Sequence, residues 1–275
     1  MTVPGGGGGG GAATWRPGVL PVTGGHLAYH RTGGDGPPLV LSHGLTDNGL
    51  CWSRLAAALA PDFDVIMLDA RGHGDSSRIS PATPHDPGRD IAEAIDHLGL
   101  EWPVVMGHSI GARATADFAN AYPGRASKVV LEDPPFLPLA DPEAAEFRRR
   151  KFRDQLAAFQ AMSDAEITGM GRKTSPAWHA DEFPAWTASK RQVDPEAMPG
   201  YQTPWQDTIT SITAPTLLIF GEPGRGGIVT PSIVDEACRI NPNISAVQIR
   251  DAGHNIRREN FPAFLSAVRV FLGER

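Results

Sequence analysis

The chain has 275 residues, 41% hydrophobic and 20% charged, so it can bury a large core in one or two domains. Its net charge of −6 and the lack of a basic block argue against nucleic acid or an anionic membrane as a partner. The two cysteines, Cys51 and Cys238, have no metal-like spacing, and buried free thiols are favoured over a disulfide. That usage predicts a reducing, cytoplasmic location, and no apolar stretch reaches transmembrane length.

Residues 1–14 are mostly glycine and lack the charged and apolar regions of a signal peptide, so we predict a disordered tail there. From residue 15, short apolar runs alternate with amphipathic segments, which is typical of a mostly parallel sheet covered by helices. Strands are predicted at 26–31, 38–42, 63–68, 103–106, 128–131, 215–220 and 245–249. Helices are predicted at 52–59, 90–98, 112–122, 231–240 and 261–271.

The alternation stops between residues 136 and 203, where no convincing strand is found. Helices are predicted at 142–162 and 164–170, and the segment 177–190 is rich in aromatic residues. This composition favours a helical cap, or lid, over a core formed by residues 15–135 and 204–275. The basic face at 148–151 is more typical of a solvated helix than of a phosphate site.

The most informative motif is Gly107-His108-Ser109-Ile110-Gly111, which follows an apolar strand and precedes a helical segment. A serine between strand and helix in this pattern is exposed on a tight, strained turn. Glycines two residues to either side avoid collisions that a side chain would make with the neighbouring strand and helix. The motif predicts Ser109 as a nucleophile and places the Ile110 N–H at a helix N-terminus, where it can stabilise an anion.

Four motifs in this order resemble the α/β-hydrolase family: His43-Gly44, the run Asp69-x-Arg71-Gly72-His73-Gly74, the serine motif, and Gly253-His254. The resemblance covers roughly residues 15–275. It implies an α/β fold with a mostly parallel eight-stranded sheet, flanking helices and an inserted helical cap. It also implies acyl chemistry that requires no metal and no organic cofactor, and neither metal-ligand spacing nor a phosphate loop is found.

A serine hydroxyl needs an adjacent base, and His254 is the best placed histidine because it lies in the loop after the last strand. The oxyanion hole is expected to combine the backbone N–H groups of Leu45 and Ile110. The resemblance gives His43 and His73 structural roles in tying loops together.

The sequence offers three candidates for the carboxylate that would orient His254. Many relatives carry it three residues beyond the glycine after the seventh strand, where this chain has Gly224. Other relatives, including haloalkane dehalogenases and zearalenone lactonases, carry it at the end of the sixth strand. The interval from Ser109 to Asp133 agrees with the second group, so Asp133 is predicted, with Glu132 and then Glu222 as alternatives.

A serine nucleophile predicts hydrolysis of a carboxylic ester or lactone through an acyl-enzyme, with a small molecule as substrate. An aromatic cap favours a hydrophobic substrate of medium size, and a zearalenone-type lactone is a specific candidate. The residues expected to line the pocket are Thr46, Trp52, Phe136, Phe159, Met162, Trp178, Phe183 and Trp186. Alternatives are a ligand receptor without turnover, a C–C bond hydrolase or an acyltransferase, and a homo-oligomer is possible.

Overall fold

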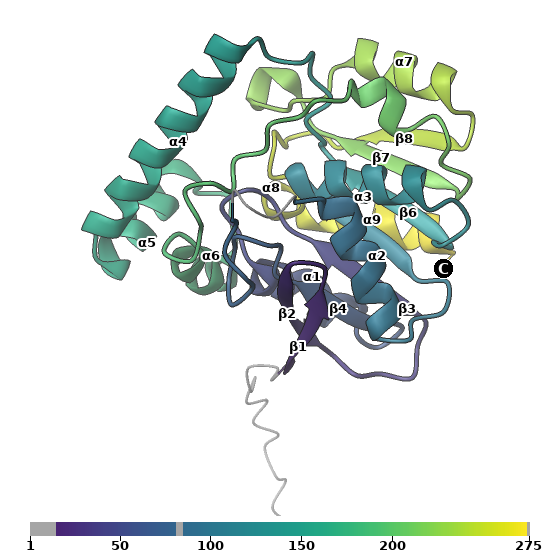
Figure 1. Cartoon of the computed structure of the whole chain (residues 1–275), viewed down its shortest axis with the longest axis horizontal. Coiled ribbons are helices and arrows are strands. Elements are labelled where there is room, and N and C mark those ends of the chain that lie inside the picture. Colours follow the sequence, from purple (N-terminus) through teal and green to yellow (C-terminus); the bar gives the residue numbers. More distant parts are fainter. Residues whose placement is uncertain (1–14, 81–84, 274–275) are drawn as a thin grey trace, which may run out of the picture.

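The computed structural model describes residues 15–80 and 85–273, and the tail predicted at 1–14 lies outside these ranges. A sheet of eight strands in the order β1-β2-β4-β3-β5-β6-β7-β8 runs through the molecule (Figure 1). The β1–β2 and β2–β4 pairs are antiparallel, and the others are parallel. The strands are β1 Arg16–Val22, β2 Gly25–Arg31, β3 Pro38–Ser42, β4 Asp64–Leu68, β5 Val104–His108, β6 Lys128–Glu132, β7 Thr216–Phe220 and β8 Ile244–Gln248.

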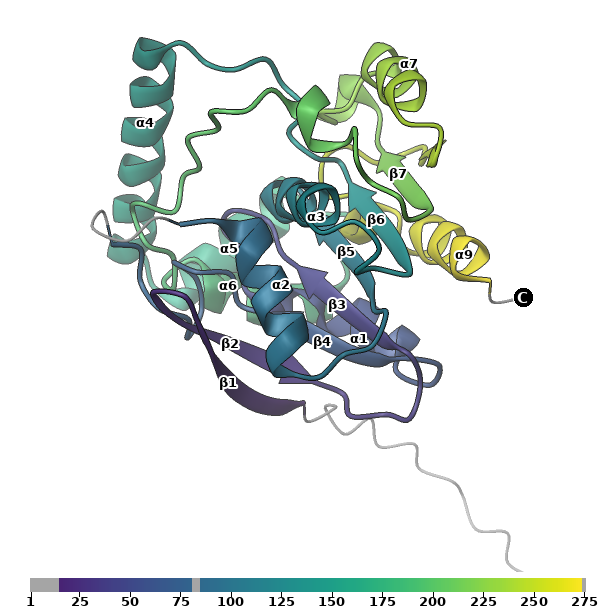
Figure 2. The same ribbon diagram turned by 45° about the vertical axis from the view of Figure 1, so that its right-hand side comes forward.

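Helices cover both faces of this sheet. Every residue of β4, β5 and β7 is buried, as expected of parallel strands packed on two sides. One face packs against α2 and α3, and the other against α1 and α9 (Figure 2). The helices of the core are η1 Gly49–Trp52, α1 Ser53–Leu59, α2 Pro87–His97, α3 Ile110–Ala121, η3 Trp205–Thr208, η4 Pro223–Arg225, α7 Pro231–Ile240, α8 Ile256–Glu259 and α9 Phe261–Leu272.

A helical insertion separates β6 from β7 and lies to one side of the sheet (Figures 1 and 2). Its elements are α4 Pro142–Ala161, α5 Asp164–Thr174, η2 Ala180–Glu182 and α6 Phe183–Ser189. α5 begins with a capping box in which Ser163 and Glu166 satisfy each other's backbone N–H groups. The insertion has an apolar cluster of its own, which includes Phe152, Phe159 and Ile167. We refer to the insertion below as the cap.

Candidate active site

The serine turn has the strained geometry that its motif predicts. Ser109 joins β5 to α3 with φ 54° and ψ −123°, a backbone conformation that residues with side chains rarely adopt. A Cβ at Gly107 would lie 2.2 Å from the Gly111 carbonyl oxygen, and one at Gly111 would lie 2.4 Å from the Ser42 carbonyl oxygen. Glycine is therefore required on both sides of the turn. The Ser109 N–H donates to the Glu132 carbonyl oxygen at 2.9 Å, which ties the turn to β6.

Ser109, His254 and Asp133 form one hydrogen-bonded chain. His254 Nδ1 lies 2.6 Å from Asp133 Oδ2, and His254 Nε2 lies 3.0 Å from Ser109 Oγ. An ionised carboxylate can only accept, so Nδ1 carries the proton and Nε2 is free to accept the serine hydroxyl proton. The structure thus brings together the three residues predicted from widely separated motifs.

The Asp133 carboxylate is fully buried and held by two backbone donors from the loop after β7. Its oxygens accept the N–H groups of Ile228 at 2.9 Å and Val229 at 3.0 Å. The resemblance places the acid of many relatives in this loop, whereas here the loop supplies amides to Asp133, the predicted acid, at the end of the neighbouring strand. Asp133 also has a positive φ of 43°, so both ends of the hydrogen-bonded chain lie on strained backbone.

The two alternative acids lie elsewhere. Glu132 precedes Asp133 on the strand, so its side chain projects to the opposite side, where it accepts the Arg257 N–H at 2.8 Å and pairs with the Arg257 guanidinium at 3.1 Å. Glu222 pairs with Arg225 at 3.0 Å and accepts the Asp251 N–H at 3.1 Å. Glu222 therefore braces two adjacent loops.

Residues 44–47, which we call the oxyanion loop, follow β3 beside Ser109. The ring nitrogen His43 Nδ1 donates to the Gly44 carbonyl at 2.8 Å, and His73 Nε2 lies 2.5 Å from the Leu45 carbonyl oxygen. Burial lowers the pKa of His43 to about 4 and that of His73 to about 3, so both rings are neutral near pH 7. These contacts agree with the loop-tying roles that the resemblance gave the two histidines.

A buried cluster of charged residues, which we call the ionic cluster, lies beneath the oxyanion loop. Its members are Asp47, Glu132, Glu182, Lys190, Arg257 and Arg258. Asp47 is at its centre, with Arg258 Nη2 at 3.0 Å, Arg257 Nη2 at 3.2 Å and Lys190 Nζ at 3.5 Å. Burial opposes ionisation of Asp47, but the three nearby cations hold its pKa well below its usual value.

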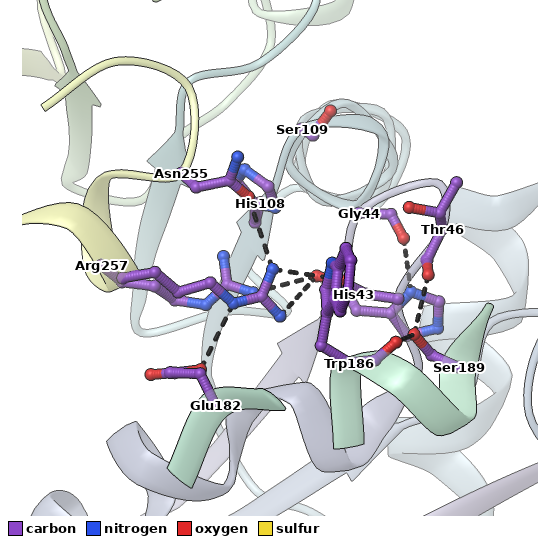
Figure 3. Close-up of polar contacts among 12 residues, drawn as sticks. His43, Gly44, Thr46, His108, Ser109, Glu182, Trp186, Ser189, Asn255 and Arg257 are labelled. Atoms are coloured by element: carbon purple, nitrogen blue, oxygen red, sulfur yellow. Dashed lines mark hydrogen bonds and ion pairs between the residues drawn. The ribbon is translucent and has the colours of Figure 1, made fainter. Parts of the chain in front are cut away.

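The ionic cluster connects elements that carry different parts of the site. Figure 3 shows Ser109 at the start of α3, with its hydroxyl directed away from Arg257 and Glu182. Asp47 comes from the oxyanion loop, Glu132 precedes the proposed acid, and Arg257 follows His254 by three residues. Glu182 and Lys190 belong to the cap, where Glu182 pairs with Arg258 at 3.3 Å. No local sequence pattern predicts this cluster, because its members are scattered through the sequence.

The residues predicted to line a substrate pocket fall into different places. Trp52 and Phe136, which are 0% and 1% exposed, present no surface to a substrate: Trp52 packs beneath the sheet against Arg257, and Phe136 stacks on Trp205. That part of the prediction is corrected, because closeness in sequence to the motifs does not place a side chain at the site. The cap residues Phe159 and Met162 pack in the cap's apolar cluster, Trp178, Phe183 and Trp186 stack on one another, and Thr46 contacts Lys190.

A cavity of about 580 Å³ lies beside α3 and is lined by Ile110, Arg113, Asp117 and Tyr201, among others. The Arg113 guanidinium lies over the Tyr201 ring at 4.5 Å and pairs with Asp117 at 3.1 Å. Ser109 and His254 do not line this cavity. It reaches the surroundings of Ser109 at Ile110, the residue whose N–H is expected in the oxyanion hole, and at His43, His73 and Gly111.

Comparisons with known proteins agree with this architecture. Residues 37–260 match the model of the alpha/beta hydrolase fold family, so the chain belongs to that family. It is 27% identical over 88% of its length to 2-(acetamidomethylene)succinate hydrolase from Mesorhizobium japonicum, covering 90% of that protein. It is 29% identical over 89% of its length to N-formylmaleamate deformylase from Pseudomonas putida, covering 91% of that protein. The crystal structure of E-2-(acetamidomethylene)succinate hydrolase superposes with a TM-score of 0.77 at 23% identity, over 94% of this chain and 99% of the other.

None of the helices in residues 15–80 and 85–273 is long and apolar enough to cross a membrane. Within the same ranges, no group of three or more His, Cys, Asp or Glu side chains is arranged to hold a metal ion.

Proposed function

We propose that the protein is a serine hydrolase that cleaves a carboxylic acyl bond through an acyl-enzyme on Ser109. The observation that carries the proposal is the chain of hydrogen bonds from Asp133 through His254 to Ser109, at 2.6 and 3.0 Å. His254 Nε2 accepts the hydroxyl proton as Ser109 Oγ attacks the carbonyl carbon. Asp133 holds the ring in the required tautomer and stabilises the imidazolium that forms.

The oxyanion of the tetrahedral intermediate would be bound by the N–H groups of Leu45 and Ile110. Ile110 is the first residue of α3, so its N–H belongs to the unpaired donors of a helix N-terminus. The intermediate then collapses, His254 returns the proton to the leaving group, and water releases the acid by the same steps. Each backbone donor of this kind is worth about 3 kcal/mol in the transition state.

A neutral ester or lactone is the substrate class we favour. The buried cations nearest to the oxyanion loop, Lys190, Arg257 and Arg258, are each paired with a carboxylate of the ionic cluster. They therefore offer little attraction to a substrate anion. A hydrophobic substrate of medium size, including a zearalenone-type lactone, was suggested by the cap aromatics, but their mutual packing weakens that argument.

Hydrolysis of a small amide is the second candidate, and it is favoured by the two relatives described above. One name describes removal of the formyl group from N-formylmaleamate, the other describes hydrolysis of an acetamido-bearing succinate, and each relative aligns with about nine-tenths of this chain. The hydrogen-bonded chain at Ser109 serves ester and amide cleavage alike, since both pass through a tetrahedral intermediate.

A substrate panel separates the two candidates. We would measure turnover of p-nitrophenyl esters from two to twelve carbons, of neutral lactones including zearalenone, and of N-formyl and N-acetyl amides with and without a carboxylate. Labelling of Ser109 by a fluorophosphonate, read by mass spectrometry, tests the nucleophile independently of substrate. Absence of both labelling and turnover would exclude the hydrolase proposal and favour a receptor.

A further inference from the structure

Two neighbouring cap side chains contact the same backbone carbonyl of the oxyanion loop. The Thr46 carbonyl oxygen accepts a hydrogen bond from Lys190 Nζ at 2.6 Å. Ser189 Oγ lies 2.8 Å from this oxygen and 2.8 Å from the Trp186 carbonyl oxygen, so its single proton is shared between the two (Figure 3 shows Ser189 beside Thr46). Ser189 is the last residue of α6, and Lys190 follows it as the C-cap. Two cap residues therefore fix the orientation of the peptide unit between Thr46 and Asp47.

That orientation is passed on to the expected oxyanion donor through planar peptides. In a trans peptide the N–H points opposite to the C=O, so fixing the Thr46 carbonyl also fixes the Asp47 N–H. The Asp47 N–H donates to the Gly44 carbonyl oxygen at 3.0 Å. The Gly44 carbonyl and the Leu45 N–H belong to the same peptide unit, so holding the Gly44 carbonyl sets the direction of the Leu45 N–H.

Lys190 is held firmly enough for this role. Its side chain is 2% exposed, and besides the Thr46 carbonyl its ammonium contacts Thr46 Oγ1 at 2.9 Å and Asp47 Oδ1 at 3.5 Å. The ammonium also lies over the Trp186 ring, 4.5 Å from its centre. A lysine ammonium has three N–H donors, and these three oxygens can accept one each.

We propose that Lys190, together with Ser189, is a positioning residue that orients the Leu45 N–H for oxyanion binding. Docking of α6 on the core and formation of a complete oxyanion hole would then be one event. The inference rests on the proposed function, because it concerns the same site and the same intermediate. No chemical step is assigned to Lys190 itself, which acts only through the loop.

The surroundings of Lys190 make its charge sensitive to pH. The groups that act on its charge are Asp47 and Cys51 from the core and Arg258 from α8, and Lys190 in turn acts on His43. Arg257 and Glu182 complete the cluster through Asp47 and Arg258. Burial lowers the pKa of Lys190 to about 8, against the opposing effect of Asp47. The pKa of Cys51 rises to about 11 through burial, so that thiol stays neutral while Lys190 loses its proton.

The first test compares Lys190→Met with Lys173→Met, a matched change of an exposed lysine on α5. With a p-nitrophenyl ester we expect Lys190→Met to lower kcat about 10- to 100-fold with little change in KM, because outright loss of an oxyanion donor costs about 100- to 1000-fold. Binding of a boronic acid, which mimics the tetrahedral intermediate, is expected to weaken by a similar factor. Lys173→Met is expected to match the wild type in both measurements.

The second test uses the charge of residue 190. The kcat of the wild type is expected to fall as pH rises through about 8, whereas Lys190→Arg, whose guanidinium stays charged, is expected to lose that decline. Ser189→Ala removes one donor to the same carbonyl and is expected to lower kcat about threefold without changing the pH profile.

The outcomes separate this inference from the proposed function. Wild-type protein that neither turns over esters nor is labelled at Ser109 would overturn both. Normal wild-type activity with Lys190→Met equal to Lys173→Met would overturn the positioning role alone. Should Lys190→Met show no cooperative thermal unfolding, the other two variants decide. The positioning role is overturned if Ser189→Ala keeps the kcat of the wild type and if Lys190→Arg has the same alkaline pH profile as the wild type.

Discussion

The strand ends and the cap hold their functional residues by different kinds of contact. At the strand ends, the Ser109 N–H donates to the Glu132 carbonyl and the Asp133 N–H donates to the Ile219 carbonyl, both at 2.9 Å. The cap instead meets the oxyanion loop through side chains, chiefly those of Ser189 and Lys190. Backbone geometry is set by the fold, whereas side-chain contacts can be exchanged and titrated. We therefore expect the nucleophile and its partners to be insensitive to conditions that change the oxyanion loop.

The largest expected effect is on the strand-end side of this comparison. Ser109→Ala removes the attacking oxygen and should lower kcat about 10⁴-fold or more, while the melting temperature stays close to that of the wild type. Turnover of the best ester and fluorophosphonate labelling measure this directly. Ser266→Ala, an exposed change on α9, is the matched control and should behave as wild type in both assays.

The next largest effect concerns the acid. Asp133→Asn is expected to lower kcat about 10⁴-fold, because an amide facing Nδ1 favours the wrong tautomer of His254. Glu132→Gln breaks the buried pair with Arg257, so its main effect should be a loss of stability of about 3 kcal/mol. Kinetics and urea unfolding of both variants separate the two roles. Nearly full activity in Asp133→Asn would refute the assignment of the acid.

Acid pH should weaken the structure around the oxyanion loop. The pKa values of His43 and His73 are lowered to about 4 and 3, so between about pH 6.5 and these values the unfolded chain binds more protons than the folded one. Stability should therefore fall as pH is lowered through this window, by up to about 1.4 kcal/mol per unit for each histidine. Urea unfolding at pH 7 and pH 5 measures the loss, and a smaller loss in His73→Gln would assign part of it to His73. A wild type equally stable at both values would contradict this.

The smallest expected effect is at Glu222, which braces the loop after β7 against Asp251 without contacting His254 itself. Glu222→Gln keeps the size of the side chain and weakens its ion pair with Arg225, which is half exposed, so a change of about 0.5 kcal/mol or less is expected. The kcat should stay within about twofold of the wild type. A loss comparable to that of Asp133→Asn would move the acid to the loop after β7.

Much of the core could be predicted because local patterns determine it. The parallel strands are continuous apolar runs, and β3 and α7 have the predicted bounds. β1 was not predicted, since Pro17 and Pro21 argue against a strand. β1 lies at the edge of the sheet, where a residue without an N–H is tolerated on the unpaired side.

The candidate site was likewise predictable only where local sequence patterns determine it. Ser109, His254 and Asp133 follow strands that lie side by side or end at the same edge of the sheet. Short motifs were enough to predict Ser109 and His254, whereas Asp133 was favoured over Glu132 and Glu222 by its interval from Ser109. The ionic cluster was missed because no local pattern pairs Asp47 with Arg258 or Lys190, which come from distant segments. The pair Arg257-Arg258, three and four residues after His254, was one available signal of buried charges, because both side chains are buried in the structure. Buried charges of this kind are rare without partners.

The anchoring of Asp133 has a consequence for how the chain could be altered. Its carboxylate depends on amide hydrogens of Ile228 and Val229, which any amino acid except proline supplies. Ile228 is only partly buried, so the identity of its side chain carries little of the acid's support. Saturation of position 228 should thus yield many active variants with proline excluded, since most side chains there leave the hydrogen bonds that hold Asp133 intact.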